Sequence, residues 1–311
     1  MNRLWTEERI EELSISPTIG EDPSDDHSEQ RELFVLLHNY FQLSHSDIFV
    51  IDLHTTSAPS APFTIVLDSL KNRKLAQYLP VPMVLGMEEH LSGTLMHYID
   101  ELGYHTMAFE SGQHDDPQSI QNHIAAIWIL LNGIGCLKKE DIEGYDEAYE
   151  QLKNTARDIA PIFEVRYRYG IMPREKFQMY PGFRNFHPVR KGQPLARNQH
   201  GEIYCKETGN IFMPLYQPQG SDGFFIIRRI HPFWIRISQW LRKHRADRLL
   251  PLLPGIKRDP NQPEMLIINR KVARWFVVEV LHLLGYRQKS YEPHKLIAVK
   301  RKYDLTSSCH Q

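Results

Sequence analysis

Two polar residues, His54 and Glu110, each follow a short apolar segment and could do chemistry together. His54 comes after Ile48–Leu53, and Glu110 comes after Thr106–Phe109. Both segments have the length and apolar character of buried strands, and ligands of open α/β sheets bind where strands end. If the two strands lie close together, the side chains converge although 110 − 54 = 56 residues separate them. An imidazole beside a carboxylate suits a metal with a general base, or acid–base catalysis alone.

The neighbours of these two residues favour a functional site. Asp52 lies two residues before His54, on the same side of the strand, where it could orient the imidazole. Thr55 and Thr56 add hydroxyl groups at the strand end. Glu110 is followed by Ser111-Gly112-Gln113-His114, a polar turn that we expect to close its strand. The alternative is that each residue only ends a strand and bonds to nearby backbone, because ring nitrogens are easily satisfied there.

The elements that would position this pair alternate along the first half of the chain. The expected strands are 48–53, 63–67, 81–85 and 106–110, and the expected helices are 33–41, 68–78, 93–102 and 120–131. We expect a surface loop over Ser16–Glu32, with Asp26 and Glu29 resembling a capping box. Asp116-Pro117 suits a helix start. Such alternation predicts an α/β fold with a mixed, partly parallel sheet and flanking helices over residues 1–160.

One apolar face is expected on each long helix of this region. In the first helix it comprises Leu33, Leu36, Leu37, Tyr40 and Phe41, and in the last it comprises Ile120, Ile124, Ile127, Trp128 and Leu131. These residues recur at helical spacing, which is typical of a face packed on a core.

The character of the sequence changes twice after this region. Glu140–Arg157 reads as a charged connecting helix. Residues 161–229 combine an alternating strand, Phe163–Ile171, with short segments separated by glycine turns, which predicts a small all-β barrel or sandwich. Residues 230–311 predict an α+β tail. Its expected helices are Trp234–Leu250 and Arg270–Leu284, and its expected strands are Met265–Ile268 and Leu296–Arg301.

Composition limits the partners and the compartment. The 311 residues are 41% hydrophobic and 24% charged, with a formal net charge of −1. No global field favours nucleic acid or an anionic membrane, so neither partner is expected. The longest apolar run, Ala125–Leu131, falls far short of the roughly 18 residues of a membrane span. Three widely separated cysteines and no signal peptide indicate the cytoplasm.

Two features in and just before the tail allow a second interpretation. Arg228-Arg229 and Arg242-Lys243-His244-Arg245 are basic clusters that could touch phosphate or lipid, although a solvated helix face explains them better, given the nearly neutral chain. Trp234, Trp240 and Trp275 are spaced like packing residues, or they could form a surface for a partner.

Several segments resemble the aspartoacylase and succinylglutamate desuccinylase family, which is related to zinc carboxypeptidases. Asp52–Thr56 resembles the segment with the third zinc ligand of that family. Phe109–His114 resembles the catalytic-glutamate segment, and Asn2–Trp5 resembles the end of the Asp-x-Asn-Arg motif. The β-rich C-terminal domain of bacterial members is similar at Tyr180–Phe183, Val189–Gly192, Met213–Tyr216 and Asp222–Phe225.

This resemblance implies a zinc-dependent hydrolase that cleaves an amide bond of an N-acyl amino acid-like small molecule. Glu110 would be the catalytic residue and His54 a zinc ligand, with Asp52 orienting its imidazole. Asn2, Arg3 and His114 would bind substrate. One zinc ion is expected in a full-length form, and the protein could form a homo-oligomer.

The resemblance lacks one part. In the family, two further zinc ligands come from an upstream His-x-x-Glu motif, which none of the sixteen histidines of this chain forms. A catalytic zinc normally has three protein ligands. We therefore expect a truncated chain that binds zinc weakly or not at all and is inactive or impaired. The alternatives are a non-catalytic binding or scaffold protein that keeps the fold, and a carboxypeptidase-like peptidase.

Overall fold

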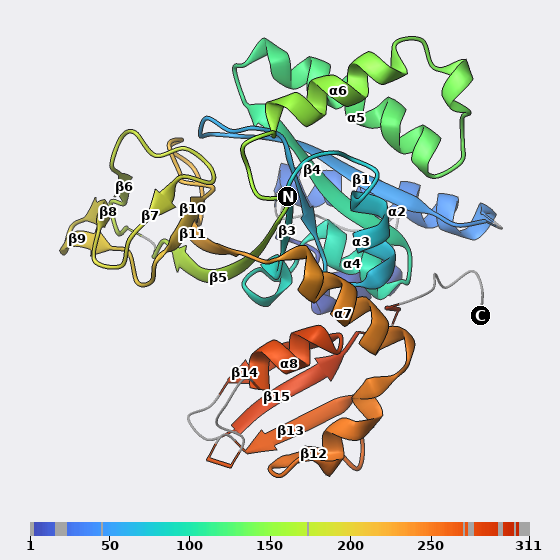
Figure 1. Cartoon of the computed structure of the whole chain (residues 1–311), viewed down its shortest axis with the longest axis vertical. Coiled ribbons are helices and arrows are strands. Elements are labelled where there is room, and N and C mark those ends of the chain that lie inside the picture. The colour runs from blue at the N-terminus through green and yellow to red at the C-terminus, as the bar shows by residue number, and fades with distance from the viewer. Residues whose placement is uncertain are drawn as a thin grey trace.

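The computed structural model describes residues 3–15, 24–44, 46–172, 174–269, 271–272, 277–291, 295–301 and 303–304. Asn2 lies outside these residues. An eight-stranded mixed sheet forms the centre of the molecule, with the order β1-β4-β2-β3-β5-β11-β10-β7 (Figure 1). Its strands are β1 (Phe49–Thr56), β2 (Phe63–Val66), β3 (Met83–Leu85), β4 (His105–Gln113), β5 (Ile162–Gly170), β7 (Pro188–Val189), β10 (Gly209–Phe212) and β11 (Asp222–Arg229).

The sheet is partly parallel, as the sequence predicts. β1 pairs with β4 in parallel, and β2, β3 and β5 are parallel to one another. β2 runs antiparallel to β4, and β11 runs antiparallel to β5. The fold class expected from the alternating elements is therefore confirmed.

Helices cover both faces of the sheet. On one face, α3 (Leu70–Ala76), α5 (Pro117–Gly133) and α6 (Tyr145–Thr155) pack on a core that includes Met107 and Phe109 of β4. On the other face, α4 (Leu95–Glu101) packs with α1 (Glu7–Ile15) and α2 (Asp25–Leu43) around Trp5, Phe34 and Ile99. The 3₁₀ turn η1 (Met87–Glu89) follows β3, and η2 (Lys139–Asp141) precedes α6.

The first long helix begins earlier than the sequence indicates. α2 starts at Asp25 with Ser24 as its N-cap, so Asp26 lies inside the first turn and residues 25–32 are helical instead of a loop. Carboxylates in the first turn suit the positive end of the helix dipole. Residues 16–23 of the expected loop lie outside the described residues.

The expected apolar faces of both long helices are partly wrong. On α2, Gln30 and Phe34 are buried, whereas Leu36 and Tyr40 are more than half exposed. On α5, Ala125, Ala126, Ile129 and Leu130 face the sheet, and the exposed apolar residues are Ile120, Ile124, Ile127 and Trp128. α5 is apolar on two sides, and the side with small alanines allows the closer approach to β4.

The β-rich region consists of strands, as predicted, and most of them continue the central sheet. β5, β11, β10 and β7 extend it, while β6 (Gln178–Met179), β8 (Pro194–Asn198) and β9 (Gly201–Tyr204) form a separate antiparallel sheet of three strands. The boundaries after residues 160 and 229 stay predictions.

The tail is α+β and has its own antiparallel sheet, in the order β12-β13-β15-β14, seen below the main sheet in Figure 1. The strands are β12 (Ile256–Arg258), β13 (Met265–Asn269), β14 (Tyr286–Tyr291) and β15 (Lys295–Lys300). The expected helix Trp234–Leu250 is divided into α7 (Pro232–Lys243) and the 3₁₀ helix η3 (Ala246–Leu252), because Arg245 adopts a φ of 51°. α8 (Val277–Leu283) matches part of Arg270–Leu284, while Arg270 and Trp275 lie outside the described residues.

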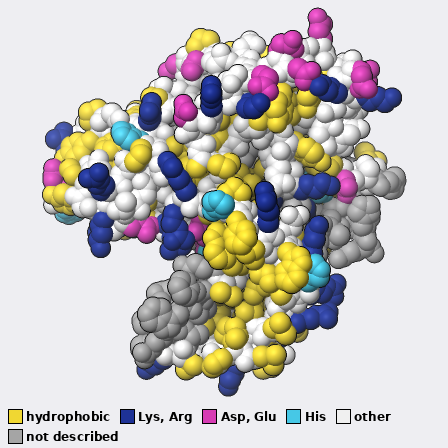
Figure 2. All heavy atoms as spheres, in the orientation of Figure 1, with side chains coloured by type: hydrophobic (Ala, Val, Ile, Leu, Met, Phe, Trp, Pro, Cys, Tyr) yellow, Lys and Arg dark blue, Asp and Glu magenta, His cyan; other side chains and the backbone are white. Residues whose placement is uncertain are grey.

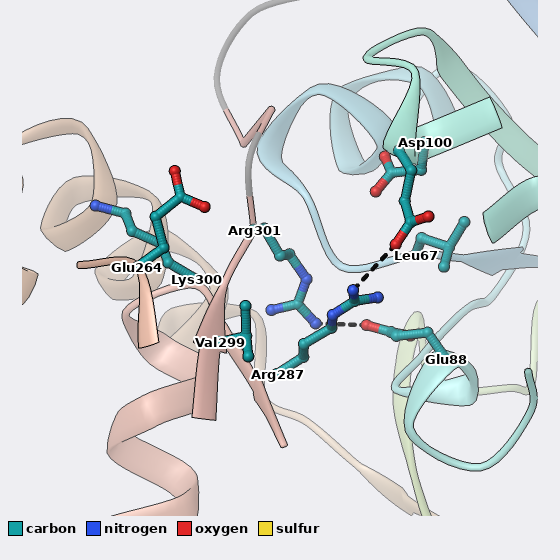
Figure 3. A pocket seen from close by; sticks show the side chains of 9 residues that line it. Leu67, Glu88, Asp100, Glu264, Arg287, Val299, Lys300 and Arg301 are labelled. Atoms are coloured by element: carbon teal, nitrogen blue, oxygen red, sulfur yellow. Dashed lines mark hydrogen bonds and ion pairs between the residues drawn. The ribbon is translucent and has the colours of Figure 1, made fainter. Parts of the chain in front are cut away.

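Buried charges join the tail to the sheet. The Arg242 side chain is 1% exposed and donates to Asp68 Oδ2 at 2.9 Å and to the Asp68 carbonyl at 2.9 Å. His282 lies 2.9 Å from Glu164 Oε1. Arg301 pairs with Glu88 beside a cavity of about 350 Å³ (Figure 3). We use the name seam for these contacts of Arg242, His282 and Arg301 with Asp68, Glu88, Glu89 and Glu164.

Candidate functional site

The structure brings His54 and Glu110 together. They are direct Cα partners in the parallel pairing of β1 with β4, near the carboxyl ends of both strands. The His54 side chain is 34% exposed, whereas Glu110 is 4% exposed. The two residues thus place an accessible imidazole next to a buried carboxyl group.

The His54 imidazole bonds to a carboxylate and not to nearby backbone. Its Nε2 lies 2.9 Å from Asp52 Oδ1, as expected for residues two apart on one strand face. The hydrogen bond to Asp52 raises the pKa of His54, and burial opposes this effect only in part. His123, on α5, holds the strand by pairing its Nε2 with the His54 carbonyl at 3.0 Å. No described residue bonds His54 Nδ1, so this nitrogen is free for a ligand.

Burial dominates the chemistry of Glu110. It raises the pKa of this carboxyl group to about 7; His54 acts to lower that value and Asp52 to raise it. Among the described residues, none bonds to the buried Glu110 Oε2. Leaving a buried polar atom unpaired costs free energy, so an arrangement like this is expected where a ligand supplies the partner. At neutral pH such a group can both accept and release a proton.

The segment after Glu110 is a strand and not the expected turn. β4 continues to Gln113, and both Ser111 and Gly112 are in the strand. A register shift opposite Thr56 accommodates the extra residue of β4. Gly112 has a φ of 136°, and a Cβ there would lie 2.8 Å from Ser119 Oγ of α5. Glycine is therefore needed both for the conformation and for the close approach of the helix.

A cavity of about 740 Å³ opens at these strand ends. Its wall combines four parts of the chain: the N-terminal segment, the ends of β1 and β4, the segment from η1 to the start of α4, and the β-rich region. The polar residues that line it include Arg3, Asp52, His54, Glu88, Glu110, His114, Gln217 and Asp222. The volume is within the usual range for a small-molecule site.

Arg3 lies in this cavity, paired with a carboxylate. Its guanidinium contacts Asp222, and Arg168 contacts the other oxygen of the same carboxylate. Arg168 also donates to the His90 carbonyl at 3.0 Å. Two guanidinium groups thus share one carboxylate, so the group formed by Arg3, Asp222 and Arg168 has a formal charge of +1. The Arg3 side chain remains 32% exposed.

His114 connects two walls of the cavity. Its Nδ1 lies 2.7 Å from Thr55 Oγ1, and its Nε2 lies 3.1 Å from Gln217 Oε1. Both ring nitrogens are therefore engaged within the protein. This geometry suits a residue that fixes the shape of the cavity.

Three polar residues of the site were not predicted from the sequence: Glu88, His123 and Gln217. Asp222 was identified only as part of the Asp222–Phe225 segment, without a role in the site. Glu88 follows β3, so the same rule about strand ends that selected His54 could have selected it. It has a second role, since Arg301 of the seam pairs with it. No sequence signal marks His123 or Gln217, and nothing in the Asp222–Phe225 segment predicts that Asp222 meets Arg3, which is 219 residues away.

The described residues do not provide the ligand set of a catalytic zinc. They contain no group of three or more His, Cys, Asp or Glu side chains arranged to hold a metal ion. His54 is the donor that the resemblance selects, and zinc normally needs two more protein ligands. The site as described therefore does not fit this metal.

Comparisons with known proteins find similarity in structure alone. No protein-family model and no curated protein matches the chain. The succinylglutamate desuccinylase of Vibrio cholerae matches with a TM-score of 0.47 at 15% identity, over 74% of this chain and 64% of that one. That of Vibrio parahaemolyticus matches with a TM-score of 0.46 at 14% identity, over 74% and 65%. Murine aminoacylase 3 matches with a TM-score of 0.42 at 14% identity, over 74% and 76%.

Each of these three TM-scores is below 0.5. This chain also spans only about 65% of the length of the two Vibrio proteins.

Proposed function

We propose that the cavity beside His54 and Glu110 binds an N-acyl amino acid-like small molecule and that Glu110 is the acid–base group for hydrolysis of its amide bond. The observation that carries the proposal is the buried Glu110 carboxyl group, whose Oε2 lacks a partner among the described residues. It faces the same cavity as an imidazole and a guanidinium group.

In this proposal Glu110 moves one proton. It takes a proton from the attacking water, whose oxygen bonds to the acyl carbon, and returns the proton to the amide nitrogen as the C–N bond breaks. The products are a carboxylate and an amine. A pKa of about 7 suits both transfers, since a general acid–base group works best when its pKa is near the working pH.

The other residues bind and orient. The bond from Asp52 to His54 Nε2 fixes the orientation of the imidazole ring, and therefore also the direction in which Nδ1 points. Arg3 would bind a substrate carboxylate, because the surplus positive charge of Arg3 and Arg168 over Asp222 attracts an anion and guanidinium pairs well with it. Asn2, His114 and Asp52 keep the roles that the resemblance gives them.

Zinc belongs to this proposal only for a form of the protein that supplies further ligands beside His54. A carboxypeptidase-like peptidase would use the same Glu110 on a peptide substrate.

A second candidate is a binding protein without catalysis. The absence of a three-ligand group from the described residues favours it. In this case the cavity would bind the same anionic ligand, and Glu110 would hold a hydrogen bond without transferring a proton.

The experiment is a hydrolysis assay of N-acetyl and N-succinyl amino acids and of short peptides, with and without added zinc. Glu110→Gln should reduce turnover by about 100-fold or more, whereas Glu147→Gln, on the exposed side of α6, should not change it. Equal turnover in the two variants would contradict the role of Glu110. If calorimetry shows that the parent chain binds an N-acyl amino acid but the assay detects no hydrolysis, the second candidate, a binding protein without catalysis, is supported.

A further inference from the structure

α7 exposes aromatic rings on an otherwise anchored helix. Phe233, Trp234 and Trp240 are 54%, 50% and 59% exposed. Figure 2 shows the hydrophobic side chains that gather over this helix, with Lys and Arg side chains nearby. Large apolar side chains grouped on a surface usually mark an interaction site.

The spacing places cations beside these rings. A helix turns by about 100° per residue, so Phe233 and Trp240, seven apart, share one stripe. Arg236 and Lys243 lie next to this stripe, and both are exposed. The solvent side of α7 therefore combines aromatic and basic side chains.

The opposite side of α7 prevents the rings from turning inward. Ile235, Ser238 and Arg242 are buried. Ser238 Oγ donates to the Leu283 carbonyl at 2.8 Å, and Arg242 is held by Asp68 in the seam. Exposure of the rings is thus a fixed property of the fold.

Exposed apolar side chains continue in and just after η3. Leu249, Leu252 and Leu253 are 62%, 79% and 49% exposed. Between Ile230 and Arg258 the sequence has seven Lys or Arg residues and one acidic residue, Asp247. Asp247 is buried, with its Oδ2 2.6 Å from Lys300 Nζ. This surface thus presents positive charge without an exposed carboxylate of its own segment.

We propose that α7 and η3 dock on the surface of a lipid bilayer that contains anionic headgroups. Tryptophan and phenylalanine favour the boundary between headgroups and acyl chains, and nearby Lys and Arg attract anionic lipid. No described helix is long and apolar enough to cross a bilayer. The proposal departs from the expectation, based on the neutral net charge, that the chain has no membrane partner.

The exposed leucines favour lipid over nucleic acid. Bases stack on aromatic rings and phosphates pair with cations, but Leu249, Leu252 and Leu253 gain nothing from either contact. Hydrocarbon accommodates all three leucines together with the rings. The proposal does not depend on any activity of the cavity.

The experiment is co-sedimentation of the full chain with two kinds of vesicles. One is pure phosphatidylcholine, and in the other about a third of the lipid is phosphatidylglycerol. The chain should pellet with the anionic vesicles and mostly remain in solution with the neutral ones. Recovery in the supernatant with both kinds would overturn the proposal, and so would binding to a single-stranded oligonucleotide without binding to vesicles.

Variants test whether binding to vesicles depends on α7 or is non-specific. Phe233→Ala combined with Trp240→Ala should weaken binding to anionic vesicles by about tenfold or more. Arg236→Gln combined with Lys243→Gln should remove most of the preference for anionic lipid. The matched control is Trp128→Ala, because Trp128 is 40% exposed on α5, a helix without any Lys, Arg, Asp or Glu. If Trp128→Ala weakens binding as much as the aromatic double variant, the assignment to α7 is wrong.

Discussion

Buried charged groups occupy two regions of this protein, the seam and the cavity at the ends of β1 and β4. In the seam each buried charge has an oppositely charged partner, although Glu88 Oε2 and His282 Nε2 form no hydrogen bond with the described residues. Arg242 pairs with Asp68, Arg301 with Glu88, and His282 with Glu89 and Glu164. In the cavity the buried Glu110 has no ion-pair partner among the described residues, and its Oε2 also forms no hydrogen bond with them. Matched charges indicate a structural role, and unmatched ones indicate a place for a ligand.

The largest effect is expected at the centre of the seam. Although burial alone would raise the pKa of Asp68, the guanidinium groups of Arg242, Arg73 and Arg301 hold it well below its usual value. Arg242→Met should therefore lower the free energy of unfolding by about 3–5 kcal/mol, because it leaves a buried charge short of a partner. Chemical denaturation measures this change. The exposed Arg248→Met is the control, and equal losses in both variants would refute the structural role of the pair.

The second effect depends on pH. Burial opposes the charge of His282, yet its hydrogen bonds to Glu164 and Glu89 raise its pKa to about 10. The pKa of His282 is thus higher in the folded state than in the unfolded state. Its stabilising effect is therefore complete below about pH 6.5 and is lost as the pH rises towards about 10. At pH 6, His282→Gln should lower the free energy of unfolding by roughly 2–4 kcal/mol.

The difference between parent and His282→Gln isolates this contribution from other titrating groups. It should shrink between pH 6 and pH 10 in urea or thermal unfolding. A difference that stays constant over this range would show that His282 acts through packing and not through charge.

A smaller effect is expected at the strand that carries Glu110. Gly112→Ala should cost about 1–3 kcal/mol of unfolding free energy, because alanine is strained at a φ of 136° and its Cβ would lie 2.8 Å from Ser119 Oγ. Adding Ser119→Ala should relieve the contact and recover part of the loss. If the double variant is no more stable than the single one, backbone strain alone explains the cost.

The smallest effect is expected at the rim of the seam. Arg287 lies 3.2 Å from Glu101, whose side chain is 45% exposed. A hydrogen bond from His97 lowers the pKa of Glu101 to about 2, and Arg287 adds to this effect. Because exposed pairs are screened by water, Arg287→Gln should change the unfolding free energy by less than about 1 kcal/mol. A loss as large as that of Arg242→Met would show that exposure does not distinguish the two pairs.

The two regions also differ in how well the sequence predicts them. His54 and Glu110 each follow a recognisable strand, and strand ends of a parallel pair meet at one edge, so their proximity was predictable. The seam was not, since Arg242 and Asp68 are 174 residues apart and each lies in an ordinary amphipathic or polar segment. No local pattern indicates which distant cation meets which carboxylate.

The errors within single elements have local causes. α5 is apolar on two sides, so its spacing alone does not show which side meets the sheet. Gly112 looks like a strand end in the sequence, but β4 passes through it with a shift in register. Arg245 interrupts the tail helix through a left-handed conformation that arginine rarely adopts.

The contrast between matched and unmatched charges is tested most directly by Glu110→Gln, with turnover or ligand binding and the free energy of unfolding measured on the same preparation. The amide has nearly the same shape as the carboxyl group but cannot ionise, so it removes the negative charge that burial disfavours. We predict that stability stays equal or rises while turnover, or binding if the chain proves non-catalytic, is lost. A clear loss of stability with unchanged turnover and binding would place Glu110 with the structural charges of the seam and contradict the account.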